Sequence, residues 1–295
     1  MLNYNFNMEI TTPQKSILVI DSGNGGKWTL NILKRFLPNE NYIFFEDDTN
    51  VPYGKKSKKK LEKITKKNLD FLLKNYSIKT VVFACNTLSS TVDNFVKKTY
   101  PNLPFVFINP CVKNFKKNTL ILCTKTTKKY NKVLKKIKEN KNVKILCFKF
   151  LAQKIDENIK NLSILQHFFN KKLKKYANMN ISNVVLGCTH YNFVKKQICF
   201  ALTKNPLVKS QKKYQILDTK KTLKSRIIFK QNFNKNLNVN TKIFVLKNCN
   251  IKFYEGSKIL AKNLSKLLDV LNIKNKQKLN GKIMFLKSSS IKNLK

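Results

Sequence analysis

Arginine is nearly absent from this strongly basic chain. The 295 residues carry 60 basic and 15 acidic side chains, a net charge of +45, yet only Arg35 and Arg226 are arginines. Proteins that read nucleic acid usually exploit the planar fork of arginine, which binds bases and phosphates through paired hydrogen bonds. Lysine is instead spread through almost every segment, beside abundant asparagine, isoleucine and phenylalanine, all amino acids with A/T-rich codons. We therefore expect weak, salt-sensitive adhesion to polyanions and no specific nucleic-acid partner.

Long apolar runs and paired cysteines are missing as well. No apolar run reaches the roughly 18 residues that a membrane span needs, so no membrane contact is expected. Residues 1–15 lack the apolar core of a signal peptide, because the run at 17–20 is short and opens the first predicted strand. The seven cysteines are an odd number without a C-x-x-C pair, which predicts reduced thiols in a cytoplasmic protein.

One short pattern occurs twice. Residues 80–87 and 183–190 each pass from an apolar, β-branched run into a small residue, a cysteine and two polar residues. Such runs predict buried strands of a parallel sheet, with Cys85 and Cys188 at the carboxyl ends, where open α/β sheets bind ligands. A helix that starts there offers free N–H groups and partial positive charge, which favour a thiolate. The repeat therefore predicts two thiols that face one ligand.

A cysteine taken singly is more often a small buried apolar residue. The remaining five cysteines lack the matched context, and we interpret them in that structural way: Cys111, Cys123, Cys147, Cys199 and Cys249.

Apolar and amphipathic segments alternate along the whole chain. They predict strands at 16–20, 42–45, 80–84, 105–108, 119–123, 143–148 and 183–187, a strand end at 215–219, a hairpin at 242–246 and 251–254, and a closing helix at 258–271. This order predicts an α/β protein with two pseudo-symmetric parallel-sheet domains and an active site in the cleft between them. The first domain is expected at 16–108 plus about 218–270 and the second at 109–217, with flexible extensions at 1–15 and 271–295.

The turn after the first strand is rich in glycine. Its sequence, residues 21–26, permits a tight strand-to-helix turn that can cradle an anion, although the dinucleotide spacing G-x-G-x-x-G is absent. Asp21 at the strand end either orients a neighbouring group or caps the following helix.

These motifs together resemble those of the glutamate racemases, within the cofactor-independent aspartate/glutamate racemase superfamily. The resemblance runs from about Ile17 to Leu268. Its motifs occur in the family's order: Asp21-Ser22-Gly23-Asn24-Gly25-Gly26, Pro52-Tyr53-Gly54, Cys85-Asn86-Thr87, Thr124 with Thr127, and Gly187-Cys188-Thr189-His190-Tyr191. Histidine after Cys-Thr is the form of glutamate racemases, since aspartate racemases of the superfamily usually carry an acidic residue there.

The resemblance implies a two-base racemisation of L- and D-glutamate that supplies D-glutamate for peptidoglycan. Cys85 and Cys188 would be the bases on opposite faces of the substrate Cα, with Asp21 and His190 as their assistants. The residues implied in substrate binding are Asp21, Ser22, Tyr53, Gly54, Asn86, Thr87, Thr124, Thr189 and His190. No cofactor and no metal are implied. A homodimer and a cell-wall precursor as activator stay open.

Several alternatives stay open as well. The family's second acidic assistant could correspond to Asp156 or to Glu157, and Asn192 replaces the family's proline, which puts catalytic efficiency in doubt. His190 could instead be a structural residue, or a zinc ligand with Cys85 and Cys188, although structural zinc sites normally show closely paired ligands. Alternative functions are racemisation of another amino acid such as aspartate, or a degenerate basic binding protein on the same scaffold.

Overall fold

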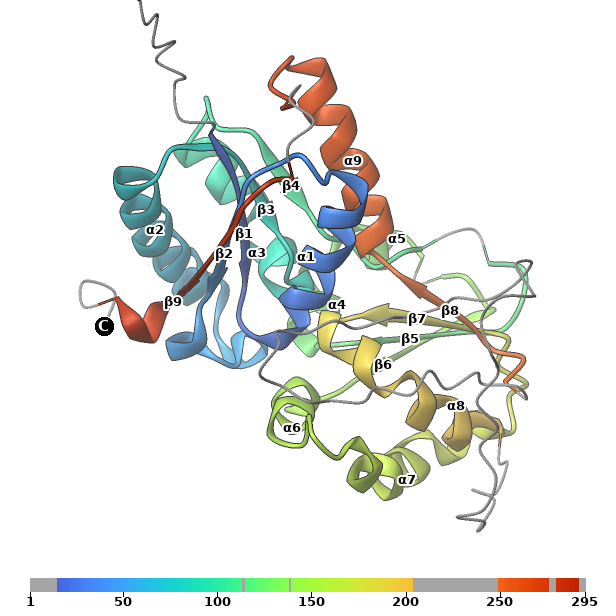
Figure 1. The fold of residues 1–295 in the computed structure, drawn as a ribbon. Helices are drawn as coiled ribbons and strands as arrows, with labels where there is room; N and C mark the ends of the chain where they lie inside the picture. The colour runs from blue at the N-terminus through green and yellow to red at the C-terminus, as the bar shows by residue number, and fades with distance from the viewer. Residues whose placement is uncertain (1–14, 113–114, 138, 204–248, 276–279, 292–295) are drawn as a thin grey trace, which may run out of the picture.

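Two parallel β-sheets, each covered by helices, make up the chain in the computed structural model (Figure 1). The structure describes residues 15–112, 115–137, 139–203, 249–275 and 280–291. Every strand pairing within this part of the chain is parallel. The predicted α/β class with two parallel sheets is therefore confirmed. The predicted strand end at 215–219 and the predicted strand at 242–246 lie outside the described residues.

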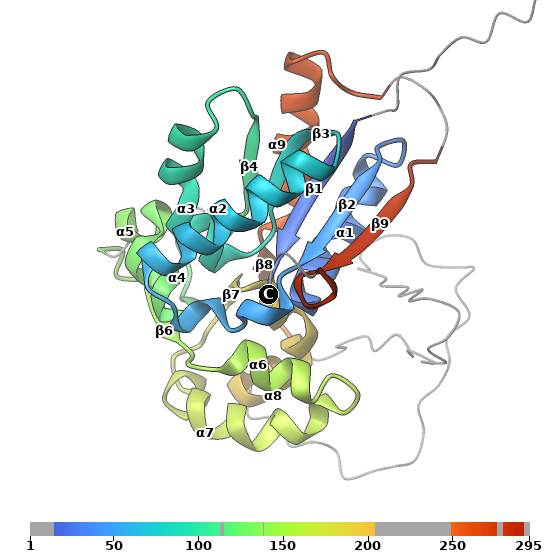
Figure 2. The ribbon, with the colours of Figure 1, turned by 90° about the vertical axis from the view of Figure 1, so that its left-hand side faces the viewer.

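The first sheet has the strand order β4-β3-β1-β2-β9. Its strands are β1 (Ser16–Asp21), β2 (Tyr42–Glu46), β3 (Ile78–Phe83), β4 (Phe105–Phe107) and β9 (Ile283–Lys287). Its helices are α1 (Asn24–Phe36) and α9 (Ser257–Val270) on one face and α2 (Lys58–Asn75) and α3 (Asn86–Thr99) on the other (Figure 2). Successive side chains of a strand point to opposite faces, so Ile17 packs with the layer of α1 and α9 while Leu18 packs with the layer of α2 and α3.

The second sheet has the strand order β6-β5-β7-β8. Its strands are β5 (Thr119–Cys123), β6 (Val143–Cys147), β7 (Asn183–Gly187) and β8 (Lys252–Glu255). Its helices are α4 (Lys125–Tyr130), α5 (Lys132–Lys136), α6 (Leu151–Glu157), α7 (Gln166–Ala177) and α8 (Lys195–Thr203). Leu122 of β5 packs with α7 and α8, whereas Ile121 and Cys123 pack with Leu134 of α5. Both faces of this sheet are thus buried.

Strands β8 and β9 lie where the sequence pattern does not predict them. Strand β8 pairs in parallel with β7 of the second sheet, although a hairpin within the first domain was expected there. Strand β9 pairs with β2 at the edge of the first sheet, within the stretch 271–295 for which a flexible extension was predicted. Its end is fixed because Ser288 Oγ donates to Asp48 Oδ1 at 2.9 Å and Ser289 Oγ donates to Asp48 Oδ2 at 2.6 Å. An edge strand with half-exposed side chains leaves little apolar signal in a lysine-rich tail, which explains why it escaped prediction.

A disulfide bond joins Cys199 of α8 to Cys249, just before β8. The prediction that all cysteines are reduced is therefore wrong for this pair. The two residues are 50 positions apart in the sequence, so no spacing motif announced their contact. The other five cysteines are free, as expected: Cys85, Cys111, Cys123, Cys147 and Cys188. No helix in the described ranges is both long and apolar enough to cross a bilayer.

The residues that follow β1 and β3 in the first sheet contact those that follow β5 and β7 in the second. Thr189, after β7, donates to Asp21 at the end of β1, and Thr87 of α3 hydrogen-bonds with Thr124 at the start of α4. Because the carboxyl ends of parallel strands share one edge of a sheet, both sheets present their ligand-binding edges to the same place.

Candidate active site

Cys85 lies between β3 and α3, as the apolar run before it predicted. It is the residue that precedes the first turn of α3, and 8% of its surface is exposed. Burial raises the pKa of its thiol well above the usual range, and the charge of Asp21 adds to the increase. The backbone N–H groups of Leu88 and Thr87 oppose that increase because they stabilise a thiolate at the helix start. The substrate-free site therefore favours a neutral thiol at Cys85.

Cys188 follows β7 in the second sheet and is equally buried, with 8% exposed. Its Sγ lies 3.9 Å from Nδ1 of His190, and Nε2 of His190 lies 2.9 Å from Oδ2 of Asp156 in α6. Thiol, imidazole and carboxyl group thus form a chain that suits proton transfer. Burial lowers the pKa of His190, but Asp156 and Cys188 outweigh this effect and raise it well above the usual range.

Asp156, and not Glu157, is the carboxyl group that contacts His190. Asn24 Nδ2 of α1 donates to Asp156 Oδ1 at 3.1 Å, which ties α6 to the first sheet. The exposed Glu157 accepts a hydrogen bond from Gln153 one helical turn earlier and faces away from the site. Geometry therefore distinguishes two residues between which the sequence left the choice open.

Asp21 is fully buried at the end of β1. Its Oδ1 accepts from the backbone N–H groups of Ser22 at 2.6 Å and Gly23 at 3.2 Å, and its Oδ2 accepts from the Thr189 hydroxyl at 3.2 Å. Burial raises its pKa to about 6, although His190 and these donors oppose the increase. The helix α1 begins only at Asn24, so Asp21 organises the preceding turn and contacts the second sheet instead of capping the helix.

The start of α1 packs directly against Thr189 and His190. The backbone nitrogen of Gly25 lies 3.4 Å from His190 Nε2. A Cβ on Gly25 would collide with the Thr189 hydroxyl and the His190 ring, and only glycine lets the two sheets approach this closely.

Three threonine hydroxyls meet where α3 and α4 begin. Thr87 Oγ1 lies 3.0 Å from Thr124 Oγ1 and 3.3 Å from Thr127 Oγ1, and the last two are 2.9 Å apart. Nearby, Thr126 Oγ1 donates to the backbone oxygen of Gly54 at 3.0 Å. Hydroxyls and free N–H groups at helix starts are suitable donors for a carboxylate.

Asn86 and Tyr53, which were also predicted to bind substrate, differ in whether their polar atoms already have a hydrogen-bond partner in the protein. The Oδ1 atom of Asn86 is buried and has no hydrogen-bond partner in the described part of the chain, so it is an acceptor available to a ligand. The Tyr53 hydroxyl, in contrast, donates to Asp47 Oδ2 at 2.6 Å, which also accepts from Asn68 Nδ2 at 3.1 Å. Its hydroxyl proton is therefore engaged within the protein. Sequence patterns gave no sign of Asp47 and Asn68, because their role depends on contacts between separate segments.

The two thiols act on each other across the junction, because the charge of Cys188 also raises the pKa of Cys85. The charge of Asp21 acts on the Cys85 thiol, and His190 lies beside the Cys188 sulfur. Within the described ranges, no group of three His, Cys, Asp or Glu residues is arranged to hold a metal ion. His167 is exposed on α7 and takes no part in the site.

The chain has relatives among known proteins. No family model matches the sequence. The chain is 35% identical over 193 residues to a glutamate racemase of Clostridium botulinum (strain Alaska E43 / Type E3), covering 63% of this chain and 74% of that protein. It is 34% identical over 199 residues to a glutamate racemase of Clostridium novyi (strain NT), covering 65% of this chain and 76% of the relative.

Solved structures share the fold at lower sequence identity. Glutamate racemase from Francisella tularensis, in complex with D-glutamate, superposes with a TM-score of 0.68 at 23% identity, covering 95% of this chain and 90% of that one. Escherichia coli glutamate racemase, in complex with L-glutamate and the activator UDP-MurNAc-ala, also reaches a TM-score of 0.68, at 17% identity, covering 95% and 91%. With relatives above 30% identity that are matched over about three quarters of their length, the chain belongs to the glutamate racemase family.

Proposed function

We propose that this chain is a glutamate racemase that interconverts L- and D-glutamate without a cofactor, with Cys85 and Cys188 as the two proton-transferring groups. One observation carries the proposal. The two free thiols come from different sheets, lie at the shared carboxyl edge and have separate acid-base neighbours, Asp21 and His190. Membership in the family supports the same reaction.

The chemistry explains why two thiols are needed. One thiolate removes the Cα proton of glutamate, and the other thiol delivers a proton to the opposite face of the resulting carbanion. The configuration inverts without rotation of the substrate. In the reverse direction the two sulfur atoms exchange roles, so each must be able to hold and to release a proton.

The neighbours of each thiol are suited to that exchange. Asp21, with a pKa of about 6, is mostly ionised at neutral pH and provides a carboxylate that can take a proton from the neutral Cys85 thiol. His190, whose pKa is raised by Asp156 and Cys188 against the effect of burial, is mostly an imidazolium and can hand a proton to the Cys188 sulfur. Both sides therefore carry a nearby site for the proton in transit.

The substrate's charges find complementary groups in the same place. We propose that the hydroxyls of Thr87 and Thr124 bind one carboxylate and that Asn86 Oδ1 accepts from the ammonium group. Backbone N–H groups at the start of α3 would stabilise the charge that develops on the α-carboxylate as Cα loses its proton. Ser22, Gly54 and Thr189 complete the proposed binding residues. Tyr53 would act through its ring and backbone because its hydroxyl donates to Asp47.

In the cell we propose a cytoplasmic enzyme that supplies D-glutamate for peptidoglycan, the role of this family. A reducing compartment suits the mechanism, since a disulfide at Cys85 or Cys188 would remove a base. The Cys199–Cys249 disulfide lies outside the site, with Cys199 almost fully buried in α8. A homodimer stays a prediction.

The test follows proton exchange in D₂O with the purified protein, reductant and each glutamate enantiomer. Wild-type protein is expected to racemise both enantiomers and to introduce deuterium at Cα. Cys85→Ala and Cys188→Ala should each abolish racemisation. Each variant keeps one base on one face, so each should exchange the Cα proton of one enantiomer only, and the two variants should prefer opposite enantiomers. Cys111→Ala, which removes a buried free thiol elsewhere, is the matched control.

Full racemisation by either active-site variant would refute the two-thiol mechanism. Turnover of L-aspartate in place of L-glutamate would support the alternative of another amino-acid substrate. Binding of nucleic acid at physiological salt by a folded protein without any exchange activity would support the basic binding protein. The names of the relatives favour neither alternative.

A further inference from the structure

Two free cysteines that the proposed racemisation does not use lie side by side in the second sheet. Cys123 and Cys147 are the last residues of β5 and β6 and are directly paired in the register of the second sheet. Their sulfur atoms are 3.8 Å apart. Neighbouring strands are separated by roughly 4.8 Å, which falls within the Cα separation that disulfides bridge. A small rotation of the side chains would bring the two sulfur atoms to bonding distance.

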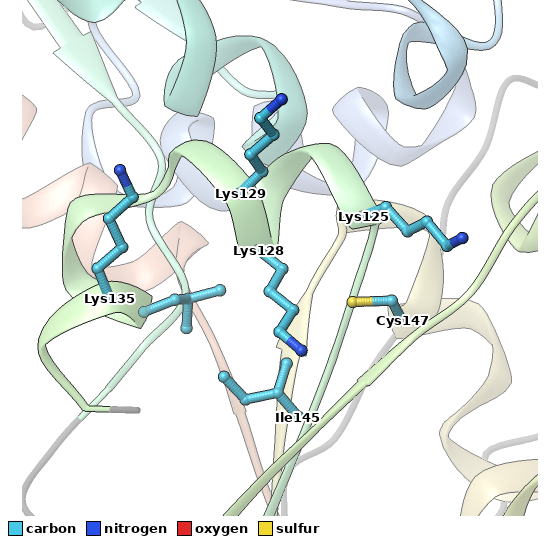
Figure 3. A pocket seen from close by; sticks show the side chains of 7 residues that line it. Lys125, Lys128, Lys129, Lys135, Ile145 and Cys147 are labelled. Carbon is cyan, nitrogen blue, oxygen red and sulfur yellow. The ribbon is translucent and has the colours of Figure 1, made fainter. Parts of the chain in front are cut away.

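The two sulfur atoms differ in access. Cys123 is fully buried among the side chains under α4 and α5, whereas Cys147 is partly exposed and lines a cavity of about 500 Å³ (Figure 3). The lining consists of Leu134, Ile145, Cys147 and four lysines: Lys125, Lys128, Lys129 and Lys135. No acidic side chain contributes to this lining. The cavity is therefore large enough for a small molecule and suited to one that carries negative charge.

The pKa values of the two thiols are shifted in opposite directions. A hydrogen bond from Cys123 lowers the pKa of Cys147, and the charges of Lys128 and Lys125 lower it further against the effect of burial. The same hydrogen bond, together with burial, raises the pKa of Cys123. The accessible sulfur is thus the nucleophile, and the buried sulfur holds the proton.

We propose that Cys147 is a modification site that reacts with small anionic disulfides, and that Cys123 is its resolving thiol. In the first step the Cys147 thiolate attacks a reagent R–S–S–R, forms the mixed disulfide Cys147–S–S–R and releases R–S⁻. In the second step the Cys123 thiol loses its proton and attacks Cys147 Sγ, forms the Cys123–Cys147 disulfide and releases the second R–S⁻. Two electrons pass from the two protein thiols to the reagent, which is reduced to two thiols.

The proposed racemisation does not use this dithiol, although Cys123 is paired in register with Gly187, the residue before Cys188. Cys123 packs on the face of the second sheet that α4 and α5 cover, while Cys188 packs with α7 and α8 on the other. The proposal does not depend on the racemase reaction, and its test needs no activity assay.

The experiment uses the full chain and 5,5′-dithiobis(2-nitrobenzoate), an anionic disulfide that releases a coloured thiolate, with peptide masses to assign each cysteine. Wild-type protein is expected to yield a Cys123–Cys147 cross-linked peptide and two released thiolates from this pair. Cys123→Ser should stop at a mixed disulfide on Cys147 with one thiolate released. In Cys147→Ser, Cys123 should remain unmodified while the protein is folded.

A second arm tests the role of charge. Lys128 and Lys125 are the lysines that lower the pKa of Cys147, so Lys129 and Lys135, which also line the cavity, are the better positions at which to test recruitment. The double variant Lys129→Gln/Lys135→Gln is expected to slow the anionic reagent by roughly four-fold at low salt, since each nearby charge contributes about two-fold. Neutral 4,4′-dithiodipyridine should react at an unchanged rate. The control double variant, Lys171→Gln/Lys172→Gln, removes two exposed lysines from α7 and should change neither rate.

Two results would overturn the proposal. The first is that, in wild-type protein, Cys147 reacts no faster than the buried Cys111 or the Cys123–Cys147 peptide does not form. The other is a cavity variant that slows both reagents equally, which would exclude selection by charge. Both measurements use the wild-type protein or variants of surface lysines. They therefore test the proposal even if Cys123→Ser fails to fold.

Discussion

The contact between Asp156 and His190 offers the sharpest test of the proposed site, and Asp156→Asn is the change that isolates it. The substitution keeps the size of the side chain and a neutral acceptor near His190 Nε2, 2.9 Å away, but removes the negative charge. A hydrogen bond to a charged group is worth about 1.5–3 kcal/mol, and a neutral acceptor retains about half of that. The expected loss of about 0.75–1.5 kcal/mol corresponds to a roughly 4- to 12-fold decrease in kcat/KM.

A comparison of kcat/KM for the two enantiomers provides an internal check on this measurement. L- and D-glutamate have equal free energies in water, so the equilibrium constant is one and kcat/KM must be equal for the two directions. The substitution must therefore lower kcat/KM by the same factor from either enantiomer. Circular dichroism of each enantiomer, followed separately, provides both values, and unequal losses would reveal an artefact of the assay or of protein folding.

The pH dependence of the same variant has a definite sign. Asp156 raises the pKa of His190 against the effect of burial, so its removal lowers that pKa. Activity that requires the imidazolium is lost as the pH rises through the pKa of His190. The alkaline limb of the rate profile should therefore move to lower pH in Asp156→Asn. Glu157→Gln, one residue away on the exposed side of α6, should leave rate and profile unchanged. An unchanged alkaline limb in Asp156→Asn, or an equal effect of Glu157→Gln, would refute the assignment of Asp156.

Three further predictions concern substrate binding and stability. Thr124→Val removes one hydroxyl from the cluster with Thr87 and should raise KM for glutamate by roughly ten-fold with a smaller change in kcat, measured by initial rates over a substrate series. Lys79→Met leaves the buried Glu40 carboxylate without its 2.6 Å ion pair and should lower the free energy of unfolding by about 3–5 kcal/mol in urea melts. Leu264→Ala empties a fully buried position of α9 and should cost about 2–5 kcal/mol in the same assay, whereas a loss below 1 kcal/mol would show that α9 adds little to the core.

The central strands and the polar residues at their ends could be predicted because each signal is local. Buried parallel strands are continuous apolar runs, and β1, β3, β5 and β7 all begin and end close to the predicted bounds. Once such strands are placed, topology alone brings their carboxyl ends together. The positions of Cys85 and Cys188 directly after β3 and β7 were therefore predictable from the sequence, whereas their catalytic role stays a prediction.

The remaining features depend on contacts that local patterns do not encode. Strand β9 is short and half exposed, so its place in the sheet comes from pairing with β2 and from the bonds of Ser288 and Ser289 to Asp48. The disulfide joins residues on both sides of a long intervening segment. The choice between Asp156 and Glu157 depends on the rotation of α6, which is set by the burial of Leu151 and Ile155. A short helix with only two fully buried side chains carries too weak a periodicity to reveal that rotation.

The near-complete burial of both reactive sulfur atoms has a consequence for the turnover number. Cys85 and Cys188 are each 8% exposed, and hydrogen bonds between the sheets, such as Thr87 to Thr124 and Asn24 to Asp156, surround them. We therefore expect glutamate to enter, and product to leave, only when these bonds break and the two halves separate. Such a motion displaces solvent, so we expect the turnover number to decrease as glycerol raises the viscosity. We also expect a small kinetic isotope effect for glutamate deuterated at Cα, because the separation of the two halves, and not proton transfer, would be the slow step.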